Sequence, residues 1–365
     1  MSDTGAKRTP AVVLGGTGYV AGELLRLLAM HPRLSVAAVL SDSQPGTSVA
    51  SAFPHLASAY PTLKFDDTQA AEKALTGTLT GARAGERACA LFSAAPHGAA
   101  AALIDRMLTA ATAAGKHPHC VDISADYRYP TAAAYQAVYG HSHGAPARIC
   151  EFTCAVPEHL AKSPTPHVAH PGCFATATLL ASVPLLALGL IEPRLFVSGI
   201  TGSTGSGRKP VDGTHHPLRH GDLYSYSALK HRHVPEITAC AKAASGIDAE
   251  FNFVPHSGPF ARGIHVTVQA TLKTARQSVE IREALTNYYQ HSPFVRISDA
   301  APRIKDVVAS NFAHVSAVAN GTTVAVMAVI DNLNKGAAGG AIQWMNRLLG
   351  FPEDTGLTAP APGWT

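Results

Sequence analysis

The sequence predicts an α/β protein with an N-terminal, Rossmann-like, doubly wound parallel sheet and a second α+β domain that carries a mostly antiparallel sheet. In the first half of the chain, short apolar strands alternate with helical segments, which is typical of a parallel sheet with helical crossovers. After about residue 193 the strands become longer and only two shorter helical stretches intervene. A chain of 365 residues is long enough for two such domains.

The alternation of strands and helices starts with a predicted strand, a glycine turn and a helix. The apolar run at 11–14 is followed by GGTGYVAG and then by the helical text ELLRLLAM. Gly16, Gly18 and Ala21 satisfy the spacing G-x-G-x-x-G/A, in which glycines let the backbone approach a pyrophosphate at a helix N-terminus. A tight turn alone would also use glycines, but the strand–turn–helix context favours a dinucleotide site.

Later strands of the first half end in candidate site loops. The strand LSVAAVL ends at residues 41–43, where a residue that reads the ribose is expected. ACALFSAAPHG (88–98), an alanine-rich helix and the strand HCVDIS (119–124) continue the alternation. Because ligands of doubly wound sheets lie at the carboxyl ends of strands, the loops at 93–97 and 124–128 are candidate site loops.

The second half of the chain is predicted to form strands in the segments LFVSGITG, EFNFVP, GIHVTVQATL and HVSAVANGTTVAVMAVID. Within the last segment, Asn320-Gly321 predicts a hairpin turn. Helices are expected around 234–244 and 278–290, and a last helix from Gly336 to Leu349 is expected to pack back on the first domain. The domains predicted in this way are a dinucleotide-binding domain at 1–170, completed by the C-terminal helix at 333–365, and a catalytic and oligomerisation domain at 171–332.

Composition argues against several classes of protein. A net charge of +4 without a basic run gives nucleic-acid binding no support. The apolar run from Cys173 to Ile191 contains Pro184 and lacks basic flanks, so we expect a buried helix, kinked or ended at Pro184, and no membrane span. Six scattered cysteines without a signal peptide predict reduced thiols in the cytoplasm. Cys150 and Cys154 lack a second pair, so no metal site is expected.

The stretch AHPGCFATA (169–177) places a cysteine between a Pro-Gly corner and the first turn of a predicted helix. Unpaired N–H groups and the helix dipole favour a negative charge at that place, which lowers the pKa of a thiol. A cysteine among Ala and Phe is also a common small core residue. This stretch alone leaves both interpretations of Cys173 open.

A reactive cysteine needs a proton partner, and the stretch HRHVPEI (231–237) offers His231 and His233. We choose His233, because Glu236 follows three residues later and can brace it if a helix starts at Pro235. His231 would then be a substrate contact or a surface residue.

Two arginines stand beside glycines, where a guanidinium can reach an anionic ligand. They are Arg208, in GSTGSGRKP, and Arg262, in PFARGI. A solvated or salt-bridged surface position is the alternative for each of them.

These motifs together resemble the N-acetyl-gamma-glutamyl-phosphate reductase family of arginine biosynthesis, which is related to aspartate-semialdehyde dehydrogenase. The resemblance runs from about residue 11 to 349 and is carried by AHPGCFATA, GGTGYVAGELLRLL, DISADYR, HRHVPEI, ARGIHVTV and DNLNKGAAGGAIQWMN. It implies reductive dephosphorylation of a small-molecule acyl phosphate, N-acetyl-L-glutamyl 5-phosphate, to the semialdehyde with NADPH, through a cysteine thioester.

The resemblance also implies roles for single residues. Cys173 would be the nucleophile and His233 the acid/base group, with Glu236 beside it. Together with the residues singled out above, the expected substrate-binding residues are Arg128, Ser203, Arg208, His231 and Arg262. The expected cofactor-binding residues are Gly15, Gly16, Thr17, Gly18, Tyr19, Val20, Ser41, Ser43, Ser93, Pro96 and Asn332.

The chain departs from the family in three places. Where the family usually has an arginine near Ser43 for the 2′-phosphate of NADP, this chain has SDSQPG. Ser41 and Ser43 can donate to such a phosphate, whereas Asp42 would repel it unless it turns outward, so we expect NADP with NAD as the alternative. GSTGSG replaces the usual SGAG, and the loop at 141–159 is rich in histidine and cysteine.

Other functions remain open at this point. The same chemistry would serve a carrier-bound aminoadipyl phosphate or an aspartyl phosphate. A non-redox cysteine hydrolase or acyltransferase would leave the glycine turn unexplained, and a non-catalytic dinucleotide sensor would not need HPGC and HRH together. Long apolar strands such as 322–330 favour a homodimer or homotetramer built on the second domain, and neither nucleic acid nor a membrane is expected as a partner.

Overall fold

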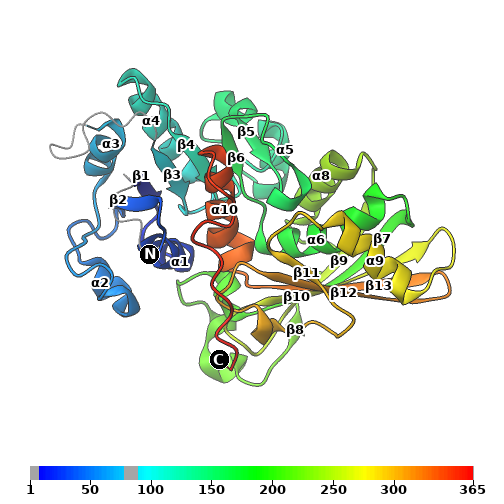
Figure 1. Ribbon diagram of the computed structural model, residues 1–365. Helices are drawn as coiled ribbons and strands as arrows, with labels where there is room; N and C mark the ends of the chain where they lie inside the picture. The colour runs from blue at the N-terminus through cyan, green and yellow to red at the C-terminus, as the bar shows by residue number, and fades with distance from the viewer. Residues whose placement is uncertain (1–7, 78–88, 365) are drawn as a thin grey trace. The chain divides into compact units, whose positions relative to one another are not determined.

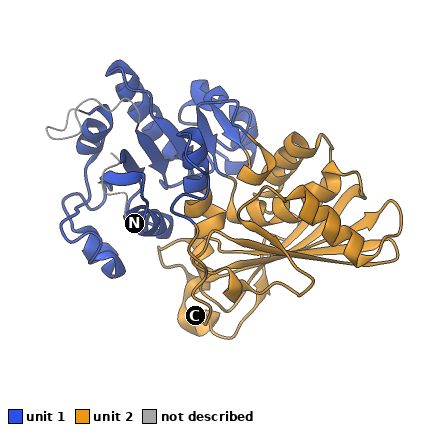
Figure 2. Ribbon diagram, in the orientation of Figure 1, with its two compact units in different colours: residues 1–154, 162–170, 341–357 blue, residues 155–161, 171–340, 358–365 orange. Residues whose placement is uncertain are grey.

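The computed structural model describes residues 8–77 and 89–364 and divides them into two compact units (Figures 1 and 2). Unit 1 comprises the described residues up to Cys154, together with 162–170 and 341–357. Unit 2 comprises 155–161, 171–340 and the described residues from Thr358 onward. Neither unit is therefore a single continuous stretch of the chain.

Unit 1 is built on a six-stranded parallel sheet in the order β2-β1-β3-β4-β6-β5. The order reverses at β1, which lies between β2 and β3, and doubly wound sheets bind ligands outside the carboxyl ends of the strands at such a point. The predicted Rossmann-like sheet is confirmed. Its strands are β1 (Thr9–Leu14), β2 (Leu34–Leu40), β3 (Ala90–Ser93), β4 (His119–Asp122), β5 (Phe152–Cys154) and β6 (His167–Ala169).

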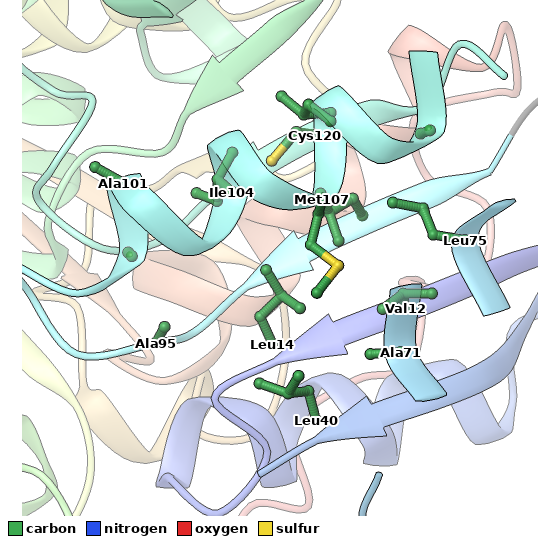
Figure 3. Close-up of a cluster of buried hydrophobic side chains, with 14 of the residues drawn as sticks. Val12, Leu14, Leu40, Ala71, Leu75, Ala95, Ala101, Ile104, Met107 and Cys120 are labelled. Atoms are coloured by element: carbon green, nitrogen blue, oxygen red, sulfur yellow. The ribbon is translucent and has the colours of Figure 1, made fainter. Parts of the chain in front are cut away.

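Apolar side chains fix the sheet of unit 1 to its helices. In Figure 3, Leu14 and Leu40 from the strands lie in one cluster with Leu75 of α3 and with Ile104 and Met107 of α4. Each large apolar side chain buried in this way contributes about 1.5–3 kcal/mol relative to an exposed one, so the cluster holds the strand ends in place. The helices are α1 (Tyr19–Ala29), α2 (Val49–Ala52), α3 (Thr68–Thr76), α4 (Ala100–Ala113) and α5 (Ala132–Tyr139), with 3-10 turns η1 (Pro54–Leu56) and η2 (Pro146–Glu151).

Unit 2 carries a seven-stranded sheet in the order β11-β12-β13-β10-β7-β9-β8. Four of its six strand pairs are antiparallel, which confirms the predicted α+β class. The predicted hairpin turn joins β12 to β13, and Gly321 adopts the left-handed φ of +59° that such turns require. The strands are β7 (Ile191–Thr201), β8 (Tyr224–Ser225), β9 (Glu250–Ser257), β10 (Ile264–Leu272), β11 (Val295–Ile297), β12 (Ala313–Asn320) and β13 (Thr323–Ile330).

The helices of unit 2 agree with the two expected around 234–244 and 278–290, but the last helix differs from the prediction. Instead of one helix from Gly336 to Leu349, a π-helical turn, η7 (Asn334–Ala338), leads into α10 (Gly339–Leu348). The turn forms early because Asp331 accepts hydrogen bonds from the N–H groups of Leu333 and Asn334, both at 2.8 Å. The other elements are α6 (Cys173–Ala187), α7 (His216–Arg219), α8 (Val234–Ser245), α9 (Ser278–Tyr288), η3 (Pro157–His159), η4 (Ser203–Ser206), η5 (Asp212–Thr214) and η6 (Ile304–Asp306).

The apolar run after Cys173 forms α6, which is buried from Phe174 to Leu186 and contains Pro184 instead of ending there. Proline has no N–H group, so the Leu180 carbonyl lacks its helical donor. The hydroxyl of Tyr289 replaces that donor at 2.8 Å, and this helix therefore depends on a side chain of another segment for its last turn. Among the described residues, no helix is both long enough and apolar enough to span a bilayer.

Candidate active site

The glycine turn of unit 1 is shaped by close backbone contacts. Gly15 has a φ of +75°, and a Cβ there would lie 2.6 Å from the backbone of Ala94, so only glycine fits. A Cβ on Gly16 would lie 2.6 Å from Val39 Cγ1. Gly18 caps α1 without a side-chain hydrogen bond, and a Cβ on it would have no neighbour nearer than 4.0 Å. The first N–H groups of α1 thus adjoin an open backbone cradle of the kind that binds a pyrophosphate.

Polar residues follow β2 at the same edge of the sheet. Ser41 Oγ and Ser43 Oγ are 3.2 Å apart, and Ser43 is exposed. The Asp42 carboxylate accepts a hydrogen bond from Thr68 Oγ1, 2.8 Å away, at the start of α3. This bond directs the charge of Asp42 toward α3.

The loops after β3 and β4 are tied together. His97 Nδ1 accepts from Ala125 N at 2.9 Å, and Asp126 accepts from Gly98 N at 2.8 Å. Ser93, the last residue of β3, is buried, and its hydroxyl has no hydrogen-bond partner among the described residues. Pro96 begins the turn that leads toward α4. The predicted residues Ser93 and Pro96 thus share the strand edge that carries the glycine turn.

Arg128 is buried beneath the stretch that enters the Pro-Gly corner. Its Nε donates to the His170 carbonyl at 2.9 Å and its Nη2 to the Ile123 carbonyl at 2.7 Å. Nearby, burial raises the pKa of Asp122 to about 6, against the opposing effect of hydrogen bonds from Ser124. Arg128 therefore braces unit 1 through backbone carbonyls, and its predicted contact with substrate stays a prediction.

Cys173 is the first residue of α6 and is partly exposed, as the sequence predicts for a cysteine at a helix start. Gly172 is the N-cap and has no side chain to satisfy the first N–H groups of the helix. The Gly172 N–H donates to Glu236 Oε1 at 2.5 Å, and Glu236 is fully buried on α8. Glu236 therefore fixes the corner in front of the thiol, a contact that the sequence analysis did not foresee.

His233 directly precedes α8, which starts at Val234, one residue before the predicted start. Its N–H donates to His231 Nδ1 at 3.2 Å, and the two ring centroids are 4.7 Å apart. Burial, and then the charge of Arg232, lowers the pKa of His231 to about 4, so this ring is neutral near pH 7. His231 is only 8 % exposed, so of the two expected roles a surface position is excluded and a substrate contact stays a prediction.

Tyr226 is a site residue that the sequence analysis missed. Its ring lies against His231, with centroids 5.6 Å apart. Burial, and then the charge of the nearby Cys173 thiolate, raises the pKa of Tyr226, so the phenol stays protonated. The backbone after it is strained, because Ser227 and Leu229 have positive φ angles of 45° and 59°. No local pattern in the sequence marks this tyrosine.

A second group of predicted residues gathers around β10 and the end of β13. Arg262 Nε is 2.6 Å from Asp331 Oδ2, and Asp331 is fully buried, whereas the Arg262 side chain is 21 % exposed. Asn332 accepts from Gly263 N at 2.7 Å and donates to Thr204 Oγ1 at 3.0 Å. Asn332 therefore joins the loop of Arg262 to the turn η4.

Ser203, Arg208 and Arg219 lie on the segment that follows β7. Ser203 begins η4 and donates its N–H to the Phe260 carbonyl at 3.0 Å, so it is held beside the Arg262 loop. Arg208 is exposed. Arg219, to which the sequence analysis assigned no role, is buried. It donates hydrogen bonds to the Ser257 hydroxyl and to the Gly258 carbonyl. Within 8–77 and 89–364, no three His, Cys, Asp or Glu side chains are grouped to hold a metal ion.

Two families of known sequences match the chain over most of its length. Residues 10–152 match the model of the semialdehyde dehydrogenase NAD binding domain, and residues 173–332 match that of the semialdehyde dehydrogenase dimerisation domain. N-acetyl-gamma-glutamyl-phosphate reductase of Pseudomonas putida is 37 % identical over 95 % of this chain and 97 % of its own. The enzyme of that name from Methanopyrus kandleri is 36 % identical over 95 % and 97 %.

Solved structures agree on the fold. Aspartate semialdehyde dehydrogenase II of Vibrio cholerae matches with a TM-score of 0.66 at 13 % identity, over 94 % of this chain and 99 % of its own. The Candida albicans aspartate semialdehyde dehydrogenase with NADP matches with a TM-score of 0.63 at 14 % identity, over 94 % and 99 %. With the sequence relatives, these matches show that the chain belongs to the N-acetyl-gamma-glutamyl-phosphate reductase family of semialdehyde dehydrogenases.

Proposed function

We propose that this protein reduces N-acetyl-L-glutamyl 5-phosphate to its semialdehyde with NADPH, releasing phosphate, through a thioester on Cys173. The observation that carries the proposal is the place of Cys173 at the first position of a 15-residue helix, whose next residue, Phe174, has its ring 5.8 Å from that of buried His231. The names of its relatives supply the substrate, because acyl phosphates of different acids call for the same cysteine chemistry.

The chemistry starts at the Cys173 sulfur. His233 takes the thiol proton, and the N–H groups at the start of α6 stabilise the thiolate. The sulfur attacks the acyl carbon, the bond from that carbon to the phosphate oxygen breaks, and a thioester remains. Backbone N–H groups placed at the carbonyl oxygen would stabilise the oxyanion by about 2.7–4 kcal/mol for each donor. The fixed Gly172 corner keeps these groups oriented during both steps.

The glycine turn fits a nicotinamide dinucleotide, because Gly15 packs against the Ala94 backbone and Gly18 leaves the first N–H groups of α1 without a covering side chain. When bound there, the dinucleotide supplies the hydride that reduces the thioester. His233 would then return its proton to the Cys173 sulfur as the C–S bond of the resulting thiohemiacetal oxyanion breaks and the aldehyde carbonyl forms. Because its pKa is low, neutral His231 is suited to donating a hydrogen bond to substrate instead of moving a proton.

We propose Arg262 as the ligand of a substrate anion. Its side chain is 21 % exposed, and its Nε is held on buried Asp331, so the guanidinium has a fixed orientation. Ser203 lies beside this loop and can donate to the same anion. The family resemblance supports Arg128 as a substrate contact and Asn332 as a cofactor contact. Arg208 is proposed as a substrate contact because it stands beside a glycine, where a guanidinium can reach an anion.

A reverse-direction assay tests substrate and nucleotide together. With phosphate and NADP⁺, we expect turnover of N-acetylglutamate semialdehyde and little with the aspartate or aminoadipate semialdehydes. NADP⁺ should give a higher kcat/KM than NAD⁺, because Ser41 and Ser43 can donate to the 2′-phosphate while Thr68 holds the Asp42 carboxylate.

The variant Ser43→Ala tests the same preference. It should lower kcat/KM for NADP⁺ and leave kcat/KM for NAD⁺ unchanged, and the control Ser48→Ala should change neither. A preference for NAD⁺ would contradict the proposed nucleotide, and faster turnover of aspartate semialdehyde would contradict the proposed substrate.

We also propose a homodimer or homotetramer, built on unit 2, in a reducing cytoplasm. The sheet of unit 2 exposes large apolar side chains, with Phe196 50 % and Val318 47 % exposed, and its family model is named a dimerisation domain. None of the six cysteines, all of which lie among the described residues, forms a disulfide. Sedimentation should give a multiple of 37.9 kDa, and a monomer at assay concentration would contradict the assembly.

A further inference from the structure

A buried π-helical turn packs directly against Cys173. Gly336 is the middle residue of η7, and a Cβ there would lie 2.7 Å from Cys173 Cβ and 3.0 Å from Cys173 Cα. Cβ atoms essentially never approach other heavy atoms to less than 3.0 Å, so this position accepts only glycine unless a segment moves. The contact joins the backbone of η7 to the first residue of α6, with no side chain between them to absorb a displacement.

The turn η7 is anchored so that it does not yield easily. Lys335 Nζ is 2.5 Å from Glu158 Oε1, and both side chains are fully buried. Moving the turn would separate this pair and leave a buried charge without its partner. At its start, the turn is capped by Asp331, the same carboxylate that holds Arg262. One short element therefore contacts both the candidate nucleophile and the support of the candidate substrate arginine.

The helix α6 is held from the same segment. His159, next to Glu158 in η3, has its Nε2 2.9 Å from the Tyr289 hydroxyl, which donates to Leu180 of α6. Since the hydroxyl proton goes to the Leu180 carbonyl, His159 Nε2–H is the donor to Tyr289. Burial lowers the pKa of His159 to about 4, so the ring is neutral and this bond persists at working pH. Both partners of the Gly336–Cys173 contact are thus fixed.

We propose that η7 is a positioning element for the Cys173 thiol and that Gly336 is the positioning residue through which it acts. This inference rests on the proposed role of Cys173 as the nucleophile. Gly336 touches no reacting atom, and it acts by holding the first residue of α6 where the helix N–H groups meet the sulfur. π-helical turns inside helical segments frequently occur at functional sites. Because a misplacement of about 1 Å can cost about 10²-fold in rate, such a support would matter for catalysis.

The test compares Gly336→Ala with Gly144→Ala. Gly144 is the control, because an added Cβ there would also be crowded, 3.1 Å from the backbone N of Ala102 in unit 1, while Gly144 belongs to none of the candidate sites. We expect Gly336→Ala to lower kcat by about 10²-fold with little change in KM. The pH midpoint of Cys173 alkylation by iodoacetamide should move upward, since the sulfur leaves the helix N–H groups. Gly144→Ala should lower the Tm while the alkylation profile and kcat stay as in the wild type.

A double-mutant comparison covers the case in which Gly336→Ala does not fold. Cys173→Gly removes the Cβ that the new methyl group would meet, so Gly336→Ala should cost much less Tm in that background. An equal loss in both backgrounds would overturn the inference, as would a wild-type alkylation profile and kcat in Gly336→Ala. A fully active Cys173→Ser would instead overturn the proposed function, while the alkylation profile would still report on the Gly336 contact.

Discussion

Cys173→Ser should lower kcat in the reverse-direction assay by about 10⁴-fold or more, the usual size of the effect when a covalent nucleophile is removed. A serine hydroxyl at the start of α6 stays protonated near pH 7, whereas a helix N-terminus favours the ionised form of a thiol. Affinity for NADPH, measured by fluorescence titration, should be unchanged, because the glycine turn belongs to unit 1.

Alkylation mapping provides the control for this variant. Cys150 is more exposed than Cys173, but it lies in the 3-10 turn η2, whereas Cys173 begins a long α-helix. Cys173 should therefore react fastest of the six cysteines, and Cys150→Ser should keep wild-type kcat. The covalent mechanism is wrong if another cysteine reacts first and Cys173→Ser turns over at a near-normal rate.

The second large effect is expected for His233→Asn, which should lower kcat by about 10²–10⁴-fold, as for other positioned acid/base groups. Asparagine can fill much of the space of the imidazole but takes up no proton at working pH. His231→Asn should act mainly on KM, because the low pKa of His231 already keeps that ring from carrying a proton.

The two variants serve as controls for each other, since both residues are 8 % exposed. Their asparagine variants should therefore lose similar amounts of Tm, and the difference in kcat then reflects chemistry. A large loss of kcat in His231→Asn with a normal His233→Asn would move the proton role to His231. Wild-type kcat in both variants would leave the proposed mechanism without its base.

The elements that sequence analysis predicts well are those set by neighbours along the chain. The glycine turn, the hairpin at Asn320-Gly321 and the helix start at Cys173 each follow from the backbone preferences of a few adjacent residues. Alternating strands and helices likewise predict the parallel sheet, because the crossover rule depends only on the order of elements. The resemblance to a known family then suggests roles for residues whose spacing in the sequence does not by itself indicate a function.

What the sequence does not reveal are contacts between distant segments. Glu236 follows His233 by three positions and was expected to brace it, a contact that stays a prediction, and its carboxylate accepts a hydrogen bond from Gly172, 64 residues away. Lys335 and Glu158 are 177 residues apart, and neither shows a local sign of burial or pairing. The π-helical turn is missed for the same reason, because its geometry depends on Asp331 and on the close approach of Cys173.

The division of the chain into interleaved segments has a consequence for its synthesis on the ribosome. His31, made early, is fully buried, and its Nε2 is 3.1 Å from Oδ1 of Asn346 in α10. Gly356 packs on the same ring so closely that a Cβ would lie 2.5 Å from His31 Cδ2. Nascent multidomain chains usually fold their N-terminal domain first. Here unit 1 reaches its final packing only after residues 341–357 have been synthesised, so its core stays incomplete while 171–340 of unit 2 are made.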